Sequence, residues 1–223
     1  MNVNRLLWLF LSLGFGAALV AGWQLVSDLE LISPVFLPGP DRAWSALVDG
    51  FASGDIVGNM IATIEHMVYG WLLASALGIA LGSLIGISPN ARAFLAPMLE
   101  FFRPLPASAM FPVAIALFGL SQSMVLAVIG FGALWPTLLA TIHGFAAVEP
   151  RLYEVSRMLG LGRWAIIRKI ALPNALPDIL AGMRLSLTVS LILSVVGEML
   201  ASAGGLGQWV LLAARAFHSA DLF

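Results

Sequence analysis

This chain of 223 residues contains no cysteine, a single lysine (Lys169) and few charges of either sign. Without cysteine it can form neither a disulfide nor a thiolate metal site. Its three histidines are scattered and form no ligand pair at helical spacing, so no metal site is expected. The lysine follows Arg168 rather than a glycine-rich turn, which excludes a phosphate-binding loop and therefore ATP hydrolysis by this chain. No nucleic-acid-binding signature is present.

Charge is scarce because apolar residues dominate. Hydrophobic residues make up 60% of the chain and charged residues 10%, against roughly 45–50% and 25% in soluble domains. A soluble fold of this length could not bury that much apolar surface, so the composition predicts an all-α, polytopic transmembrane helical bundle. We expect one transmembrane domain over residues 1–223, with five spans at about residues 6–26, 62–87, 104–120, 124–145 and 185–203. The first span also resembles a signal peptide, but its apolar part exceeds the usual length of about 7–15 residues.

The few charges are segregated by side. If the N-terminus is cytoplasmic, only Arg42 and Arg215 lie outside, and the other basic residues lie inside. Those others are Arg5, Arg92, Arg103, Arg151, Arg157, Arg163, Arg168, Lys169 and Arg184. Cytoplasmic loops of membrane proteins carry an excess of Lys and Arg. The sequence therefore predicts a multi-pass membrane protein whose N-terminus is in the cytoplasm.

The most basic stretch is residues 151–177, which lie in a predicted cytoplasmic loop over residues 146–184. Residues 151–159 have the apolar spacing of a short amphipathic helix. Gly160 can end that helix, because glycine tolerates the left-handed conformation of a helix C-terminus. A second short helix is expected from residue 163 until Pro173 stops it.

The spacing inside this loop is more specific than its charge. Glu154-Val155-Ser156 is followed by three residues and Gly160, and then by nine residues and Ile170-Ala171-Leu172-Pro173. This pattern resembles the "EAA" loop of binding-protein-dependent ABC importer permeases, with Val155-Ser156 where the family often has two alanines.

The resemblance implies the type I ABC importer permease fold and a loop that docks onto a separate ATPase. The implied coupling residues are Glu154, Val155, Ser156, Arg157, Leu159, Gly160, Ile170, Leu172 and Pro173. The alternative is an amphipathic loop that lies on lipid headgroups without any protein partner.

The resemblance also implies the partners. Two ATPase subunits would bind ATP and Mg, which leaves no cofactor in this chain. A second copy of the permease, a periplasmic or lipid-anchored solute-binding protein and the lipid of a bacterial inner membrane complete the expected assembly. Permeases of this family usually have six spans, so we expect a sixth span to be missing at the C-terminus.

Two short motifs indicate a group within the family. Leu37 to Pro40 (LPGP) and Arg103 to Pro106 (RPLP) are similar to motifs of sulfonate-, taurine- and nitrate-type permeases. That similarity implies a small organic or inorganic anion, such as a sulfonate, taurine, nitrate or bicarbonate, or a pyrimidine precursor of thiamine. The rival classes are an ion-coupled secondary transporter, which would use intramembrane carboxylates in repeated halves, and a membrane scaffold subunit.

Two features within the spans are candidates for the translocation path. The prolines after Arg103, namely Pro104, Pro106 and Pro112, free backbone carbonyls. Within a membrane such carbonyls are tolerated where they face protein or a water-filled path, so this segment is a candidate to line or gate the translocation path. The alternative is a kink with only a structural role. Glu198 is an intramembrane carboxylate, which is a functional candidate by default. A structural hydrogen bond is the alternative for Glu198.

The second span carries Gly78, Gly82 and Gly86, each four residues apart. On a helix these glycines share one face and form a smooth groove in which another helix packs. Glu65 and His66, near the other end of the span, are expected to be solvated at the membrane interface.

Overall fold

The computed structural model describes the backbone of residues 3–222 and the side chains within that range, except those of residues 3–6, 157 and 163. Each regular element in this range is a helix, which confirms the predicted all-α fold. The helices form two compact units. One consists of Met1–Met60 with Gln208–Phe223, and the other of Ile61–Gly207.

The first unit contains α1 (Val3–Asp28), α2 (Pro40–Ser53) and η3 (Ser219–Asp221). The indole nitrogen of Trp23 in α1 donates to the carbonyl oxygen of Pro38 at 2.9 Å, so the LPGP segment turns back onto the end of α1. Gln24 donates to Asp41 Oδ1 at 3.2 Å, and this hydrogen bond holds the pKa of Asp41 below its usual value. Pro40 begins α2, where its missing N–H costs nothing.

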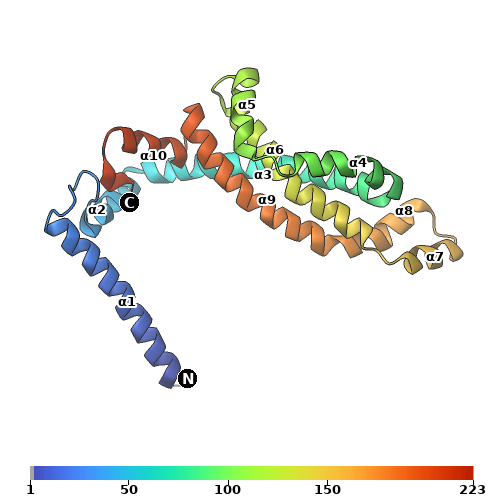
Figure 1. Cartoon of the computed structure of the whole chain (residues 1–223), viewed down its shortest axis with the longest axis horizontal. Helices are drawn as coiled ribbons and strands as arrows, with labels where there is room; N and C mark the ends of the chain where they lie inside the picture. Colours follow the sequence, from blue (N-terminus) through green and yellow to red (C-terminus); the bar gives the residue numbers. More distant parts are fainter. Residues whose placement is uncertain (1–2, 223) are drawn as a thin grey trace. The chain divides into compact units, whose positions relative to one another are not determined.

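The second unit is built on the long helices α3, α6 and α9 (Figure 1). Its elements are α3 (Asp55–Ile87, which begins in the first unit), α4 (Pro89–Phe102), η1 (Ala107–Met110), α5 (Phe111–Phe118), α6 (Gln122–Ala146), α7 (Pro150–Met158), α8 (Arg163–Ile166), η2 (Ile167–Ala171) and α9 (Leu172–Ala201); α10 (Leu206–Arg215) begins at its end. Among the described residues, four helical segments are long and apolar enough to cross a membrane, or five if one bent pair of helices counts as a span.

Helix α6 packs against both α3 and α9. Along the contact between α3 and α6, residue numbers rise in the same direction in both helices. Gly70 lies against Ile129, Gly82 against Thr141 and Gly86 against Phe145. These two helices therefore run parallel. Along α6 and α9 the contacts run in opposite directions: Gly197 meets Val125, Gly132 meets Leu193 and Gly144 meets Ala175. Helix α9 is thus antiparallel to both α3 and α6.

The predicted third span, residues 104–120, is not a straight helix. The chain instead forms α4 and then η1 with α5, and the two parts are bent by 84° at residues 103–106. Helix α4, of 14 residues, is about 21 Å long and too short to cross a hydrocarbon core of about 30 Å alone. Because α3 and α6 run parallel, the chain must return between them, and this broken pair is the segment that makes the return. The prolines at the bend remove backbone donors there and favour the break.

The expectation that Pro173 stops a helix was wrong. The chain stays helical from Arg163 to Ala201, so residues 172–184 belong to α9 rather than to the predicted loop. The reason is a π turn: in η2 the Leu172 amide donates to the carbonyl of Ile167, five residues earlier. This wide turn comes directly before Pro173, which then lies in the first turn of α9, where proline is tolerated.

Candidate functional site

Helix α7 has one face packed against the unit and one face exposed. Tyr153 packs against a buried apolar cluster that consists of Phe145, Val148, Ala171, Ala175 and Ile179. Burial raises the pKa of the Tyr153 hydroxyl, although Arg92 acts in the opposite direction, so the phenol is neutral at physiological pH. Ser156 is buried and its hydroxyl donates to the Leu152 carbonyl. The packing of Tyr153 anchors the inner face of α7, and the Ser156 hydrogen bond lies within the helix.

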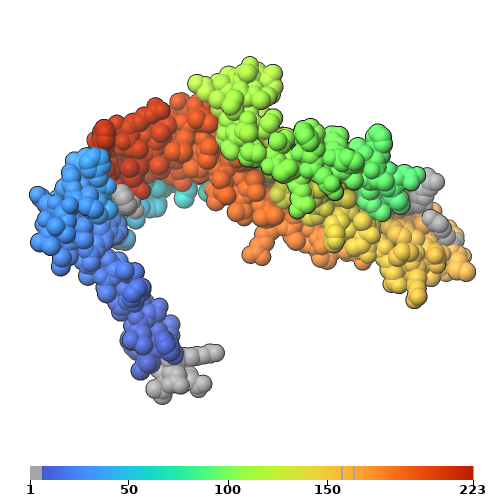
Figure 2. All heavy atoms as spheres, viewed as in Figure 1, coloured from blue at the N-terminus to red at the C-terminus, as the bar shows by residue number. Residues whose placement is uncertain are grey.

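The opposite face of the α7–α8 segment is apolar and open to solvent. The exposed fractions are 88% for Met158, 71% for Leu159 and 83% for Trp164, and Val155 is also exposed. Figure 2 shows α7, in yellow, at one end of the second unit. In a part of a protein that lies in water, several large apolar side chains exposed together mark an interaction site.

Gly160 ends α7 as the sequence predicts. Its φ is +70°, and the Leu161 amide donates to the carbonyl of Ser156 at 3.0 Å. This six-to-one hydrogen bond after a left-handed glycine is the Schellman arrangement of a helix C-terminus. A Cβ at Gly160 would meet nothing within 4 Å, so the position requires glycine for its backbone conformation rather than for space.

The structure brings most of the remaining coupling residues to the same end of the unit. Glu154, exposed, lines a cavity of about 710 Å³ between α7, η2 and the α3–α4 turn, together with Tyr153 and Ile167. Ile170 packs against the apolar cluster behind α7, whereas Leu172 and Pro173 are exposed. The side chain of Arg157 lies outside the described residues, so the coupling role implied for Arg157 stays a prediction.

The candidates for the translocation path fall into two separate places. Arg103, Pro104, Pro106 and Pro112 are all exposed and lie at or just after the bend between α4 and α5. Glu198 instead lies on α9, where it is wholly buried (0% exposed). Its Oε2 accepts from the Thr63 hydroxyl at 2.8 Å and from the Gly207 amide at 3.0 Å. A role for either set in a path stays a prediction.

His66 is the site residue that sequence reasoning missed. The expectation of interfacial solvation was wrong for it, since its side chain is 3% exposed and its Nδ1 lies 2.9 Å from Glu198 Oε1; Glu65 is exposed. Thr63 and His66 are three residues apart on one face of α3. That spacing alone could not identify Glu198 as the partner, because α3 and α9 meet only in the tertiary fold.

The three spaced glycines of α3 lie against α6. A Cβ at Gly82 would be 2.6 Å from the Thr141 Cβ and 2.8 Å from the Leu138 carbonyl oxygen. A Cβ at Gly78 would meet the Leu138 amide at 3.1 Å, and one at Gly86 would meet the Phe145 Cβ at 2.7 Å. Both helix backbones therefore approach at a distance that only glycine allows.

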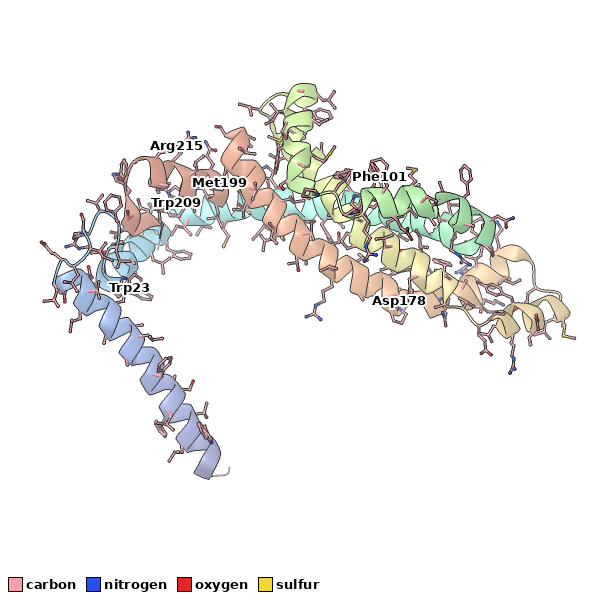
Figure 3. The ribbon with its side chains drawn as sticks, viewed as in Figure 1. Trp23, Phe101, Asp178, Met199, Trp209 and Arg215 are labelled. Atoms are coloured by element: carbon pink, nitrogen blue, oxygen red, sulfur yellow. The ribbon has the colours of Figure 1, made fainter. Side chains whose placement is uncertain are left out.

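A further pair of titratable side chains lies between α6 and α9. His143 Nδ1 on α6 lies 3.5 Å from Asp178 Oδ2, and Figure 3 labels Asp178 on α9. Both side chains are partly or largely exposed, so the pair contributes little. No group of three His, Asp or Glu side chains among the described residues could hold a metal ion.

Comparisons with known proteins agree with this architecture. Residues 74–221 match the family described as "Binding-protein-dependent transport system inner membrane component". The chain is 33% identical over 205 residues to the putative aliphatic sulfonates transport permease protein SsuC of Bacillus subtilis, covering 92% of this chain and 74% of that protein. It is 31% identical over 205 residues to the taurine transport system permease protein TauC of Escherichia coli, covering 90% and 74%.

A solved structure shares the fold. The inward-facing MetNI methionine ABC transporter matches with a TM-score of 0.63 at 20% identity, covering 76% of this chain and 87% of that chain. At this identity the likeness shows the fold alone, and it confirms the type I importer permease fold predicted from the loop. The family match over residues 74–221 and the 33% identity to SsuC show the family: this chain belongs to the inner membrane permeases of binding-protein-dependent ABC importers.

Proposed function

We propose that this chain forms the translocation path of an ATP-driven importer for a small anion, and that its α7–α8 segment docks onto a separate ATPase. The observation that carries the docking is the exposed apolar face of Val155, Met158, Leu159 and Trp164 within a cationic segment. Large flexible or aromatic side chains of this kind are typical binding hot spots.

The length of the continuous helical run from α8 through η2 to the end of α9 argues against a loop that merely lies on lipid. The helical run Trp164–Ala201 has 38 residues and is therefore about 57 Å long. A hydrocarbon core takes about 30 Å, which leaves roughly 27 Å of helix outside it. Apolar faces of interfacial helices bury only about 5–10 Å into the headgroup region. With that excess on the cytoplasmic side, the α7–α8 end lies beyond the hydrocarbon core, where a soluble protein can reach it.

The packing directions support the sidedness. If α7–α8 is cytoplasmic, the C-terminal end of α9 is on the outer side, as are the first residues of α3 and α6. A chain that reaches the start of α3 on the outer side through one earlier span, α1, has its N-terminus in the cytoplasm. This agrees with the distribution of Lys and Arg.

The proposed working assembly is the one that the family implies. Two permease copies stand side by side and two ATPase subunits, which bind ATP and Mg, each hold one α7–α8 segment. Closure of the ATPases moves these segments together, and a solute-binding protein delivers the solute on the outer side. The names of SsuC and TauC favour a sulfonate or taurine as the solute. Nitrate, bicarbonate and a pyrimidine thiamine precursor are the other members of the proposed set.

Uptake into proteoliposomes tests the proposal. The permease, its co-expressed ATPase and the binding protein are reconstituted, and uptake of labelled taurine, an alkanesulfonate, nitrate and bicarbonate is measured with and without ATP. We expect ATP-dependent accumulation of at least one of these anions. Uptake driven by an ion gradient without ATP would contradict the proposal.

Replacing Gly160 with valine is expected to uncouple hydrolysis from transport. A β-branched residue at φ +70° costs roughly 1–2 kcal/mol of backbone strain, enough to shift the angle between α7 and α8. Uptake per assembled complex should fall about 5–30-fold while ATP hydrolysis continues. Gly162→Ala is the matched control, because Gly162 has no left-handed φ and open space around its Cβ position. Equal loss of uptake in both variants would count against a special role for Gly160.

A further inference from the structure

The second unit contains a buried polar cluster at the end of α9 opposite the α7–α8 segment. The cluster consists of Thr63 and His66 from α3, Glu198 from α9, and the backbone amides of Leu206 and Gly207. All three side chains are at most 3% exposed. Glu198 lies 26 residues along α9 from Leu172, or about 39 Å along the helix axis. The cluster is therefore remote from the proposed ATPase site.

The hydrogen bonds of the cluster form one connected set. The Leu206 amide donates to Thr63 Oγ1 at 2.9 Å, so the Thr63 hydroxyl hydrogen is available to donate to Glu198 Oε2. The Gly207 amide donates to the same Oε2. Oε2 therefore accepts two hydrogen bonds, and Oε1 lies within hydrogen-bond distance of His66 Nδ1.

The segment after α9 is folded directly onto this carboxylate. A Cβ at Gly205 would lie 2.3 Å from Glu198 Cδ, and one at Gly207 would lie 2.1 Å from the Val195 carbonyl oxygen. Gly205 also has a φ of +112°. The segment of residues 202–207 (the outer loop) can take this path only because it has no side chain at these two places.

Stability alone does not explain a carboxylate at this position. Burying a charged group costs several kcal/mol even when it is paired, and apolar residues of similar size often pack as well or better. What an acceptor with two oxygens provides instead is a fixed connection between three separate segments. Its partners fix the positions of α3, α9 and the outer loop relative to one another.

We propose that Glu198 is a positioning residue that locks the outer loop onto α3, so that the outer ends of α3 and α9 move as one body during transport. This inference rests on the proposed importer function. It assigns the importance of Glu198 to hydrogen-bond geometry rather than to its charge or to contact with the solute.

The substitution Glu198→Gln separates geometry from charge. The glutamine oxygen can replace Oε2 and accept from Thr63 and Gly207, while its NH₂ group donates to His66 Nδ1 when that ring carries its proton on Nε2. Glu198→Ala removes both acceptors. Thr63→Val removes the hydroxyl that links Leu206 to Glu198, and Thr63→Ser keeps it. The threonine pair keeps the test decisive if Glu198→Ala does not assemble.

The first readout is amide hydrogen exchange at Leu206 and Gly207 in the purified, ATPase-bound complex. We expect exchange of these amides to be about tenfold faster or more in Glu198→Ala and Thr63→Val, and to stay near the parental rate in Glu198→Gln and Thr63→Ser. Parental exchange rates in both Glu198→Ala and Thr63→Val would overturn the proposed lock.

The second readout is the maximal uptake rate per assembled complex, with the binding-protein concentration for half-maximal uptake measured separately. We expect the rate to fall about tenfold in the two disrupting variants and the half-maximal concentration to stay unchanged. Faster exchange with a parental uptake rate would refute the positioning role, as would a Glu198→Gln variant that keeps parental exchange but is as inactive as Glu198→Ala. If the parental complex moves none of the anions, the importer proposal fails, while the exchange rates still decide whether the lock exists.

Discussion

Replacing Met158 and Trp164 together with aspartate is expected to abolish the co-purification of the ATPase with this permease. Their side chains are the most exposed apolar groups of the α7–α8 segment, at 88% and 83%. Truncation of one hot-spot residue typically costs about 2 kcal/mol or more of binding free energy, and two introduced carboxylates add desolvation cost. Affinity for the ATPase should therefore fall about 100-fold or more. The ratio of ATPase to permease after purification in mild detergent measures it.

The matched control keeps the apolar surface. Met158→Leu combined with Trp164→Phe should retain the ATPase at close to the parental ratio. Neither side chain supports the fold from within, so the aspartate variant should still insert and run as a monodisperse permease. Retention of the ATPase by the aspartate variant would show that the exposed face binds something else.

Replacing Gly82 with alanine is expected to destabilise the permease by about 1–3 kcal/mol, the usual cost of forcing an extra methyl group into a packed interface. The new Cβ would lie 2.8 Å from the Leu138 carbonyl oxygen, which is backbone and cannot rotate away. Thermal unfolding of the detergent-solubilised protein, followed by loss of the monodisperse peak, measures the effect.

Gly130→Ala is the control, because Gly130 lies on α6, the other helix of the same pair. Its Cβ would meet only Leu73 Cδ2 at 3.7 Å, an ordinary contact. Because alanine favours the helix over glycine by up to about 1 kcal/mol, this variant should be as stable as the parent or slightly more stable. Equal destabilisation by both substitutions would mean that the close contact of Gly82 with α6 is not the cause of the lost stability.

The sequence predicted the features that depend on local chemistry. Apolar composition indicated the helical bundle, and the spacing around Gly160 predicted where α7 ends, because a left-handed residue there depends only on the backbone. The glycines of the second span identified the surface that lies against α6. In each case the physical cause lies within a few residues along the chain.

Features that depend on tertiary contacts were not predictable in this way. Pro173 normally ends a helix, and the π turn of η2 that accommodates it leaves no mark in the residue pattern. The 84° break between α4 and α5 was not predicted, because a kink in this segment was only the alternative to a role in the translocation path. His66 was predicted to be an interfacial residue, because its partner Glu198 comes from a distant part of the chain.

Site-directed cross-linking from residue 158 tests the docking claim most directly. The chain contains no cysteine, so Met158→Cys provides a single attachment point for a photoactivatable maleimide in the assembled complex, and Leu13→Cys in α1 provides an exposed control. The account predicts a cross-link from position 158 to the ATPase subunit and none from position 13. A cross-link from position 158 to lipid alone, or labelling of this position from the periplasmic side of the membrane, would contradict it.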